Sequence, residues 1–300
     1  MIRVQREIHL LGSKTKRHYV LFAGPRIRCY LAGSDFTSVN TMDLPVPLRR
    51  YRSNRAQATV VLRGEYSILR DGKIHTLQPG DLAMEMLGDG RERWDGPNVE
   101  LFVVEWETDT PVTLTIGKLG AAQLANLRAA VHEITTTAHL TPAQFEPLFR
   151  LMDLSNMQQL DMLVHEAFSD PQRRFLAPLA ALLGEIFSNL HTNPMWVNFL
   201  EKIEMSERHA RRHLTTLLTT MGLPPSHLSL RAYLHRVRIT HAVGFLRVKG
   251  ATVSQVAHTL GYGSDRALAT ALRQSELGSP TALRHSSNEL RSYEKNDGVH

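Results

Sequence analysis

One stretch of 22 residues, from Thr252 to Arg273, constrains the fold more than any other part of the chain. Its first half, TVSQVAHTL, repeats apolar residues at helical spacing, which predicts a short amphipathic helix. Gly261 follows, and glycine reaches the left-handed backbone conformation that ends a helix and begins a sharp turn. Ser264 is a favoured N-cap residue and starts a second helix. This pattern is typical of a helix-turn-helix unit.

The second helix of this unit has one apolar and one polar face. Leu268, Ala271 and Leu272 are spaced so that they face inward together. In helix-turn-helix proteins the exposed face of the second helix contacts base edges in the major groove of DNA. The candidate DNA-binding residues on this face are Ser264, Arg266, Thr270 and Arg273.

A second copy of the pattern lies 58 residues upstream, where Ser206 takes the place of Ser264. This shift brings FLEKIEMSERHARRHLT, Phe199 to Thr215, into the same frame. The exposed face of the upstream copy is the more basic of the two. Its candidate DNA-binding residues are Arg208, Arg211, Arg212 and Thr215.

A long helix, Leu230 to Arg247, is predicted between the two copies. Its apolar stripe is expected to face inward, and Arg231, Arg236 and Arg238 are expected to stay in solvent. A helix of this length spans about 27 Å, which is close to the repeat of about 34 Å for one turn of DNA. One chain would therefore be able to read two successive major grooves.

The two copies together resemble the DNA-binding domain of the AraC/XylS family of bacterial transcription regulators. The resemblance rests on VSQVAHTLGYGSDRALATALR, residues 253–273, and on LGSPTALR, residues 277–284, which is similar to the closing Gly-x-Ser-Pro of the family with one residue missing. The first copy departs further, because Gly222-Leu223-Pro224-Pro225 replaces that closing motif. About the last third of the chain is covered by the resemblance.

This resemblance implies a sequence-specific DNA-binding transcription regulator, in the role of an activator, with its DNA-binding domain at residues 194–286. The implied partner is double-stranded promoter or operator DNA. Further candidate partners are RNA polymerase, a small-molecule or protein effector, and a second copy of the chain.

The distribution of charge independently favours a nucleic-acid partner. The whole chain carries a net charge of +6. From Phe199 to Arg284 there are 12 Lys and Arg residues against 5 Asp and Glu residues, a net charge of +7, which leaves −1 for the remainder. A basic region confined to one module is the electrostatic signature of nucleic-acid binding, whereas a merely solvated face would mix the two signs.

Residues 1–115 read as short strands separated by turns. The predicted strands are Ala58–Gly64, Glu65–Arg70, Lys73–Leu77 and Val99–Glu107, with a hairpin turn at Asp71-Gly72 and a corner at Pro79-Gly80-Asp81. Regular short strands of this kind favour a small barrel or a double-sheet jelly roll. The region from Val60 to Met84 is similar to the cupin-type sensor domain that precedes the DNA-binding half of many such regulators.

The expected fold class is therefore α+β and multidomain, with a cupin-like β-barrel, a helical connector and an all-α DNA-binding domain with two helix-turn-helix units. The connector, residues 116–193, contains predicted helices around Leu119–Ile134, after Thr141-Pro142, at Asn156–Phe168 and at Asp170–Leu190. Their apolar faces either fold onto the barrel or pair between subunits. Residues 287–300 are expected to be a polar tail.

No catalytic site is predicted, and no metal or cofactor is expected. Cupin enzymes hold a metal ion with two or three histidines and a carboxylate, but the N-terminal region has no His-x-His, and His75 is interpreted as structural. The sequence has no Gly-x-Ser-x-Gly and no phosphate-binding loop. The alternative hypotheses are a cupin-fold enzyme with an appended helical domain, and a helical bundle for protein interaction.

Residues that bind an effector are not identified by the sequence. The run Arg49-Arg50-Tyr51-Arg52 either attracts an anionic effector or forms a charged strand edge, and Trp94 and Trp106 either line a pocket or fill the core. Cys29 is the single cysteine, which excludes an internal disulfide and a Cys-based zinc site. The lack of a signal-peptide core or a long apolar run favours a cytoplasmic protein without membrane contact.

Overall fold

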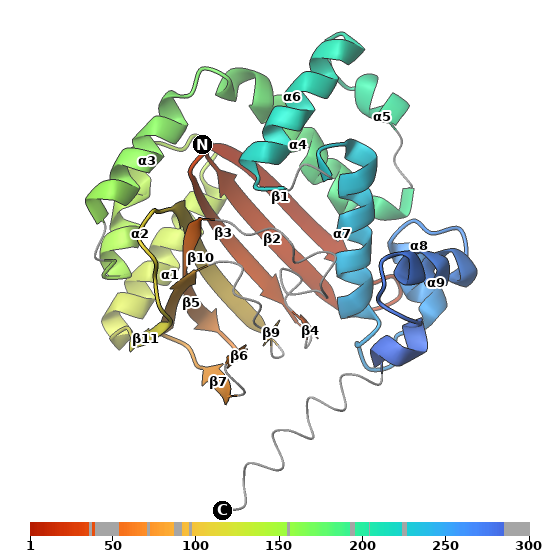
Figure 1. Ribbon diagram of the computed structural model, residues 1–300, viewed down its shortest axis with the longest axis horizontal. Helices are drawn as coiled ribbons and strands as arrows, with labels where there is room; N and C mark the ends of the chain where they lie inside the picture. The colour runs from red at the N-terminus through yellow and green to blue at the C-terminus, as the bar shows by residue number, and fades with distance from the viewer. Residues whose placement is uncertain are drawn as a thin grey trace, which may run out of the picture.

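The computed structural model describes residues 1–35, 38–39, 54–70, 73–86, 92–95, 98–154, 157–192, 196–203, 205–223 and 227–284. It has an α+β fold in which helices lie on either side of a large antiparallel sheet (Figure 1). None of the helices in these ranges is long and apolar enough to cross a membrane.

Within the described residues the larger sheet has seven strands in the order β1-β2-β3-β10-β5-β8-β11. Their bounds are β1 Ile2–His9, β2 Lys16–Ala23, β3 Ile27–Ser34, β5 Arg55–Arg63, β8 Asp81–Met86, β10 Val99–Glu107 and β11 Thr115–Lys118. The long buried strand predicted at Val99–Glu107 is confirmed as β10, which lies in the middle of the sheet between β3 and β5.

A smaller sheet has, in the part of the chain that the structure describes, four strands in the order β4-β9-β6-β7. Their bounds are β4 Ser38–Val39, β6 Tyr66–Arg70, β7 Lys73–Leu77 and β9 Glu92–Asp95. Strands β6 and β7 pair antiparallel with Arg70 opposite Lys73, as the predicted hairpin requires, and the turn residues Asp71 and Gly72 lie outside the described residues. Gly80 forms the next corner with a left-handed φ of 91°.

Both faces of the larger sheet are buried. Side chains alternate along β10, so that Leu101 and Val103 belong to one apolar cluster while Phe102 and Val104 belong to another. The first cluster also contains Tyr66 of the smaller sheet, which places the two sheets around a shared core. The predicted strands therefore form a double-sheet arrangement.

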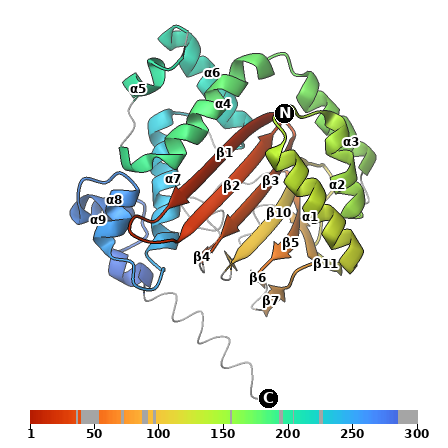
Figure 2. The same cartoon turned by 180° about the vertical axis from the view of Figure 1, so that it is seen from behind.

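The second face of the larger sheet is covered by the connector helices (Figure 2). These are α1 Ala121–Thr136, α2 Glu146–Leu151 and α3 Met157–Ser169, with a short 3-10 turn, η2 Pro142–Gln144, before α2. Leu127, Phe149 and Leu163 lie in the same cluster as Trp106, which is 3% exposed. The connector helices thus fold onto the sheet, and Trp106 fills the core.

Helix α4, Arg173–Ser188, packs along the edge strand β1. Gly184 makes this approach close, because a Cβ atom there would lie 2.3 Å from the carbonyl oxygen of Gln5. The backbone amide of Glu7 also donates a hydrogen bond to the hydroxyl of Ser188 at 3.2 Å. The 3-10 turn η3, Leu190–Thr192, follows and leads toward the C-terminal helices.

The C-terminal helices share the apolar cluster of β1 and α4. Their bounds are α5 Trp196–Leu200, α6 Glu207–Thr220, α7 Leu230–Phe245, α8 Val253–Thr259 and α9 Asp265–Gln274. Leu214, Val237 and Leu268 belong to the same cluster as Val4 and Leu183. The hydrophobic core therefore continues from the sheet into these helices without a break.

Helix α7 differs from its prediction in length and in exposure. It ends at Phe245 and has 16 residues, which gives a length of about 24 Å. Arg231 is exposed as expected, but the expectation that Arg236 and Arg238 stay in solvent is wrong, since both side chains are half-buried. Burial lowers the pKa of both guanidinium groups. The reason is that α7 is packed on its sheet side and again on its α8 side, so little of its polar face reaches water.

Candidate nucleic-acid interface and adjoining cavity

The second helix-turn-helix unit has the turn that its sequence predicts. Gly261 has a φ of 72°, and the amide of Tyr262 donates to the carbonyl of Ala257 at 2.9 Å while that of Gly261 donates to His258 at 3.1 Å. These two bonds form the Schellman motif that closes a helix with a left-handed residue. Ser264 then caps α9, because its Oγ accepts a hydrogen bond from the amide of Ala267 at 3.2 Å.

Helix α9 buries its apolar face and exposes its basic face. Leu268, Ala271 and Leu272 are buried. Arg266 and Arg273 are exposed together with Ser264, while Thr270 is half-buried. The guanidinium of Arg273 donates only weak bonds within its own helix, to the carbonyl of Ala269 and the hydroxyl of Thr270, each at 3.4 Å. Both arginines therefore present their charge to solvent.

In the first unit, helix α6 begins after Ser206 and places all four candidates, Arg208, Arg211, Arg212 and Thr215, in exposed positions. Its inner face, with Ala210 and Leu214, is buried. The structure thus confirms the predicted helix frame of this copy.

The four candidates of α6 are not equivalent. Arg211 pairs with Glu207 through Nε at 2.9 Å and Nη2 at 2.5 Å, and its guanidinium lies 4.8 Å from the ring centre of Trp196. Hydrogen bonds from Arg211 and then Trp196 lower the pKa of the Glu207 carboxyl. Within the described residues, Arg208 and Arg212 have no such ion pair. Their charge is the more available for a ligand.

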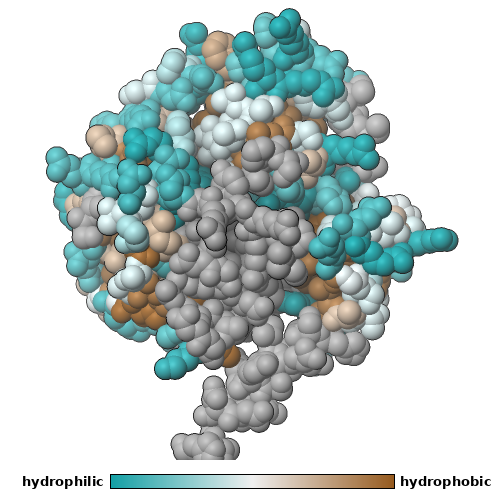
Figure 3. Space-filling view, viewed as in Figure 1, coloured by the Kyte–Doolittle hydropathy of each residue, from teal (hydrophilic) through white to brown (hydrophobic). Residues whose placement is uncertain are grey.

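The surface over both units is hydrophilic. Figure 3 shows polar side chains gathered over α6 and over the region of α8 and α9. His213 of α6 instead stacks on Phe175 of α4, with ring centres 5.2 Å apart. This contact packs the His213 ring against α4.

A cavity of about 150 Å³ lies behind this surface, between the larger sheet and α7. Its sheet wall comes from β1, β2, β3, β5, β6 and β10, and its helix wall from α7 and the end of α6. The polar or aromatic residues around it are Arg6, Arg17, Tyr19, Arg28, Tyr30, Gln57, Tyr66, Glu105, Tyr233, Arg236, Thr240 and His241.

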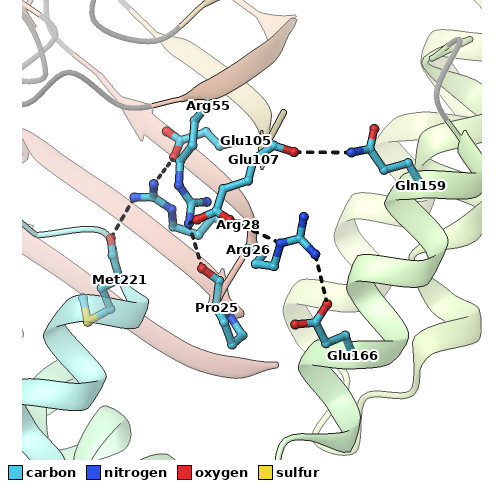
Figure 4. A network of polar contacts seen from close by, with 9 residues as sticks. All are labelled: Pro25, Arg26, Arg28, Arg55, Glu105, Glu107, Gln159, Glu166 and Met221. Carbon is cyan, nitrogen blue, oxygen red and sulfur yellow. Dashed lines mark hydrogen bonds and ion pairs between the residues drawn. The ribbon is translucent and has the colours of Figure 1, made fainter. Parts of the chain in front are cut away.

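Arg28 links the sheet wall to the end of α6. Its guanidinium pairs with the buried carboxylate of Glu105 at 3.2 Å and donates to the carbonyl oxygen of Met221 at 2.9 Å. Gly222 permits this approach, because a Cβ atom there would lie 1.7 Å from Nη1 of Arg28. Figure 4 also draws a second set of contacts, in which Glu107 of β10 pairs with Arg55 and Arg26, and Arg26 pairs with Glu166 of α3. Polar contacts therefore join the sheet to the connector and, separately, to the end of α6.

His241 of α7 lies fully buried beside this cavity. Neither of its ring nitrogens has a hydrogen-bond partner in the described part of the chain. Burial, followed by the charges of Arg6 and Arg17, holds the pKa of the imidazole well below its ordinary value. The ring is therefore neutral at physiological pH, with one nitrogen able to donate and the other to accept.

The sequence pattern does not indicate the cavity. His241 lies on the buried face of α7, where it is 3% exposed, and helical spacing alone gives it no role. One signal was present in β1, where Arg6 shares a strand face with Ile2, Val4 and Ile8. A charged side chain on an otherwise apolar strand face indicates a buried polar site.

The remaining candidates divide between the core and the undescribed segments. His75 is half-buried on β7, paired across the hairpin with Ile68. Arg49 to Arg52 and the side chain of Trp94 lie outside the described residues. Cys29 is buried. In the described ranges no three His, Cys, Asp or Glu residues converge as a metal site would require.

Comparison with known proteins shows only distant similarity. No family model and no curated protein sequence matches the chain. The structure of ToxT from Vibrio cholerae is 10% identical over 86% of this chain and 98% of its own, with a TM-score of 0.33. YlbA from E. coli is 12% identical over 39% and 54% of the two chains, with a TM-score of 0.28. KdgF from Halomonas sp. is 14% identical over 31% and 79%, with a TM-score of 0.24. Similarity at this level does not establish a function.

Proposed function

We propose that this protein is a sequence-specific transcription regulator that binds double-stranded DNA through two helix-turn-helix units. In this proposal residues 194–286 are the AraC-like DNA-binding domain, residues 116–193 connect it to the rest, and residues 1–115 are a cupin-like sensor domain. The protein acts in the cytoplasm without a metal or cofactor.

One observation carries the proposal. Helices α6 and α9 each bury an apolar face in the common core and expose arginines on the opposite face, with Arg208 in the frame of Arg266. A bundle that only binds other proteins has no need for a basic face repeated at the same helix position, whereas DNA presents its phosphates and bases at each helical turn.

The residues divide between two kinds of contact. Arg266 and Arg273 face outward from α9 and suit paired hydrogen bonds to guanine in the major groove. Arg208 and Arg212 suit phosphates, because their guanidinium groups are exposed and outside any described ion pair. Thr215 and Thr270 provide hydroxyl groups at the edges of these faces. Ser264 orients α9 through its cap.

The regulator has further partners in this proposal. An effector binds to the N-terminal part, a second copy of the chain forms a homodimer, and RNA polymerase is contacted at the promoter where the protein acts as an activator.

The proposal is tested by selecting sequences from a random double-stranded library with the full-length protein. We expect an enriched site with two blocks about one helical turn apart, bound with a Kd at least about a thousandfold lower than that for scrambled DNA. Fluorescence anisotropy with the selected site gives the affinity. A selection that enriches nothing, or binding that ignores the sequence, would contradict the proposal.

A further inference from the structure

The exposed face of α6 is flanked by another helix on each of its two sides. By helical spacing, the exposed Arg208 and Arg212 lie in the middle of this face. On one side Arg211 contacts the first residue of α5. On the other side His213 stacks on Phe175 of α4, with ring centres 5.2 Å apart. The connector helix α4 therefore borders the surface that we assign to DNA.

A stack of three side chains runs from α4 onto α6 along this border. The guanidinium of Arg174 lies 4.6 Å from the ring centre of Phe175, and Phe175 stacks on His213. The ring of His213 in turn lies beside that of His209, with ring centres 6.4 Å apart. Phe175 remains 41% exposed, so the stack lies at the surface rather than in the core. It places a cation of the connector at the edge of the basic face of α6.

The charge of Arg174 stands out within the connector. Residues 116–193 contain 5 Lys and Arg residues against 7 Asp and Glu residues, a net charge of −2. Two of the five cations pair with carboxylates, and a third donates hydrogen bonds to a backbone carbonyl. Within the described residues Arg173 and Arg174 pair with no carboxylate, and only Arg174 is fully exposed. An acidic segment thus keeps an exposed cation at the place where it meets α6.

The geometry of the major groove brings phosphates to both sides of an inserted helix. The groove is about 12 Å wide and a helix with its side chains is about 10–12 Å in diameter, so the elements beside the helix lie next to the two backbones. On the α5 side the guanidinium of Arg211 is already paired with Glu207. On the α4 side Arg174 has no such ion pair in the described part of the chain. A phosphate is the anion that DNA offers to a guanidinium at this position.

We propose that the start of α4 is part of the DNA interface, and that Arg174 binds a backbone phosphate beside the groove that α6 enters. The ring of Phe175 holds the guanidinium in place through its cation–π contact, so little side-chain freedom is lost on binding. This inference rests on the proposed function and goes beyond it, because it gives the connector a direct contact with DNA. The contact adds affinity without base preference, since phosphates carry no sequence information directly.

The first test measures the affinity of the full-length protein for the selected DNA site at several salt concentrations. Arg174→Gln should reduce the log–log salt slope by about 0.9, the value for one phosphate contact, and Arg174→Lys should keep the wild-type slope. At physiological salt Arg174→Gln should weaken binding at least about threefold, equally for the selected site and for its single-base variants. Arg150→Gln is the matched control, since Arg150 is exposed on α2 of the same connector, and it should change neither quantity.

The second test locates the contact on the DNA. Cys29 is the single cysteine of the chain, and burial raises the pKa of its thiol, so a thiol-reactive iron–EDTA reagent attaches to the thiol that Arg174→Cys introduces. We expect this conjugate to cleave the backbone beside one block of the selected site, the block whose base preference Arg273→Ala leaves unchanged. The Arg150→Cys conjugate should cleave nowhere within the site.

The possible results separate this inference from the proposed function. A wild-type chain that selects a DNA site, together with an Arg174→Gln variant that keeps the wild-type salt slope, would overturn the inference and leave the proposed function standing. Equal losses in Arg174→Gln and Arg150→Gln, or no cleavage from the Arg174→Cys conjugate, would also overturn it. A changed base preference in Arg174→Gln would contradict the assignment to a phosphate. A wild-type chain that selects no site would contradict the proposed function and the inference together.

Discussion

The two helix-turn-helix units reach a similar arrangement by different physical means. In the second unit local backbone chemistry is sufficient: Thr252 caps α8 through a reciprocal pair of hydrogen bonds with Gln255, Gly261 takes the left-handed conformation, and Ser264 caps α9. In the first unit Ser206 stands at the start of α6 without a side-chain capping bond. The first unit is therefore more dependent on packing.

The helix that precedes each second helix shows the same contrast. The shift of 58 residues places Phe199 where the second unit has Ala257. Phe199 is fully buried and stacks on Trp196 with ring centres 5.1 Å apart. A small residue lets two helices approach, while an aromatic residue fills the space between them. The second unit therefore packs its helices closely at Ala257, whereas the first unit fills the same position with the large side chain of Phe199.

The two units also attach to the sheet at different points. The first is joined through the Arg28 guanidinium and the carbonyl of Met221. The second is joined through the amide of Leu11, in the turn between β1 and β2, which donates to the hydroxyl of Thr259 at 3.0 Å. Because these attachments are separate, each unit can be loosened while the other stays in place.

The largest expected effect is the loss of the attachment of the first unit. Arg28→Ala leaves the buried carboxylate of Glu105, which is 1% exposed, without its partner, and breaking such a pair costs about 3–5 kcal/mol. Urea denaturation measures the free energy of unfolding. The double variant Arg28→Met, Glu105→Leu is the control and should recover most of that stability. A cost below about 1 kcal/mol for Arg28→Ala would contradict the role of this pair.

The next effect concerns the exposed face of α9, which carries Arg266 and Arg273. Arg266→Ala or Arg273→Ala should cost about 1–3 kcal/mol of DNA-binding free energy where the residue pairs with guanine, and should relax the preference at one base. Anisotropy titrations with the selected site and its single-base variants measure both quantities. Arg150→Ala, on the exposed side of α2, is the control. Unchanged affinity in both variants would remove this face from the DNA interface.

A smaller effect is expected at the turn of the second unit. Gly261→Ala forces a side chain into a left-handed residue at about 1–2 kcal/mol, and its Cβ atom would also lie 2.1 Å from the carbonyl oxygen of Leu190. Thermal unfolding should show the destabilisation as a lower Tm. Gly263→Ala is a close control, because a Cβ atom there meets no other atom within 4 Å. If both variants melted alike, the turn would not govern the packing of α8.

Helix α7, between the two units, is expected to make the free energy of unfolding depend on pH. Burial lowers the pKa of His241 in the folded chain, so the unfolded chain binds the proton first as the pH falls below about 6.5. The free energy of unfolding should then fall by up to about 1.4 kcal/mol per pH unit. His241→Gln should flatten this slope, while His209→Gln, at an exposed position, should leave it unchanged. Parallel slopes for both variants would rule out His241 as the source.

The smallest expected effect is a change in the salt dependence of DNA binding, which should differ among the arginines of the first unit. Removing both Arg208 and Arg212 should reduce the log–log salt slope of DNA binding by about 0.9 for each phosphate that the variant no longer neutralises. Arg211→Ala should change the slope less, since Glu207 and Trp196 already engage that guanidinium. Affinity measured at several salt concentrations tests this order. A variant that lacks Arg208, Arg211 and Arg212 together and keeps the wild-type salt slope would show that α6 does not touch DNA.

The sequence by itself determined the features that depend on neighbouring residues. The left-handed Gly261, the cap at Ser264, the strand Val99–Glu107 and the antiparallel pairing around Asp71-Gly72 were all predicted, and the structure contains them. Capping, turn geometry and strand alternation act over a few residues, so they can be recognised without knowing what lies across the molecule.

The tertiary structure alone decided which polar faces are covered. Arg236 and Arg238 have the spacing of solvated residues, yet they are half-buried because the sheet and α8 both pack on α7. The cavity likewise depends on a distant pair, because Arg28 meets Met221 across 193 positions of sequence. The attachment of the second unit depends on Leu11 and Thr259, which are 248 positions apart. Local patterns carry no information about such pairs, because burial depends on which element the folded chain places opposite each face.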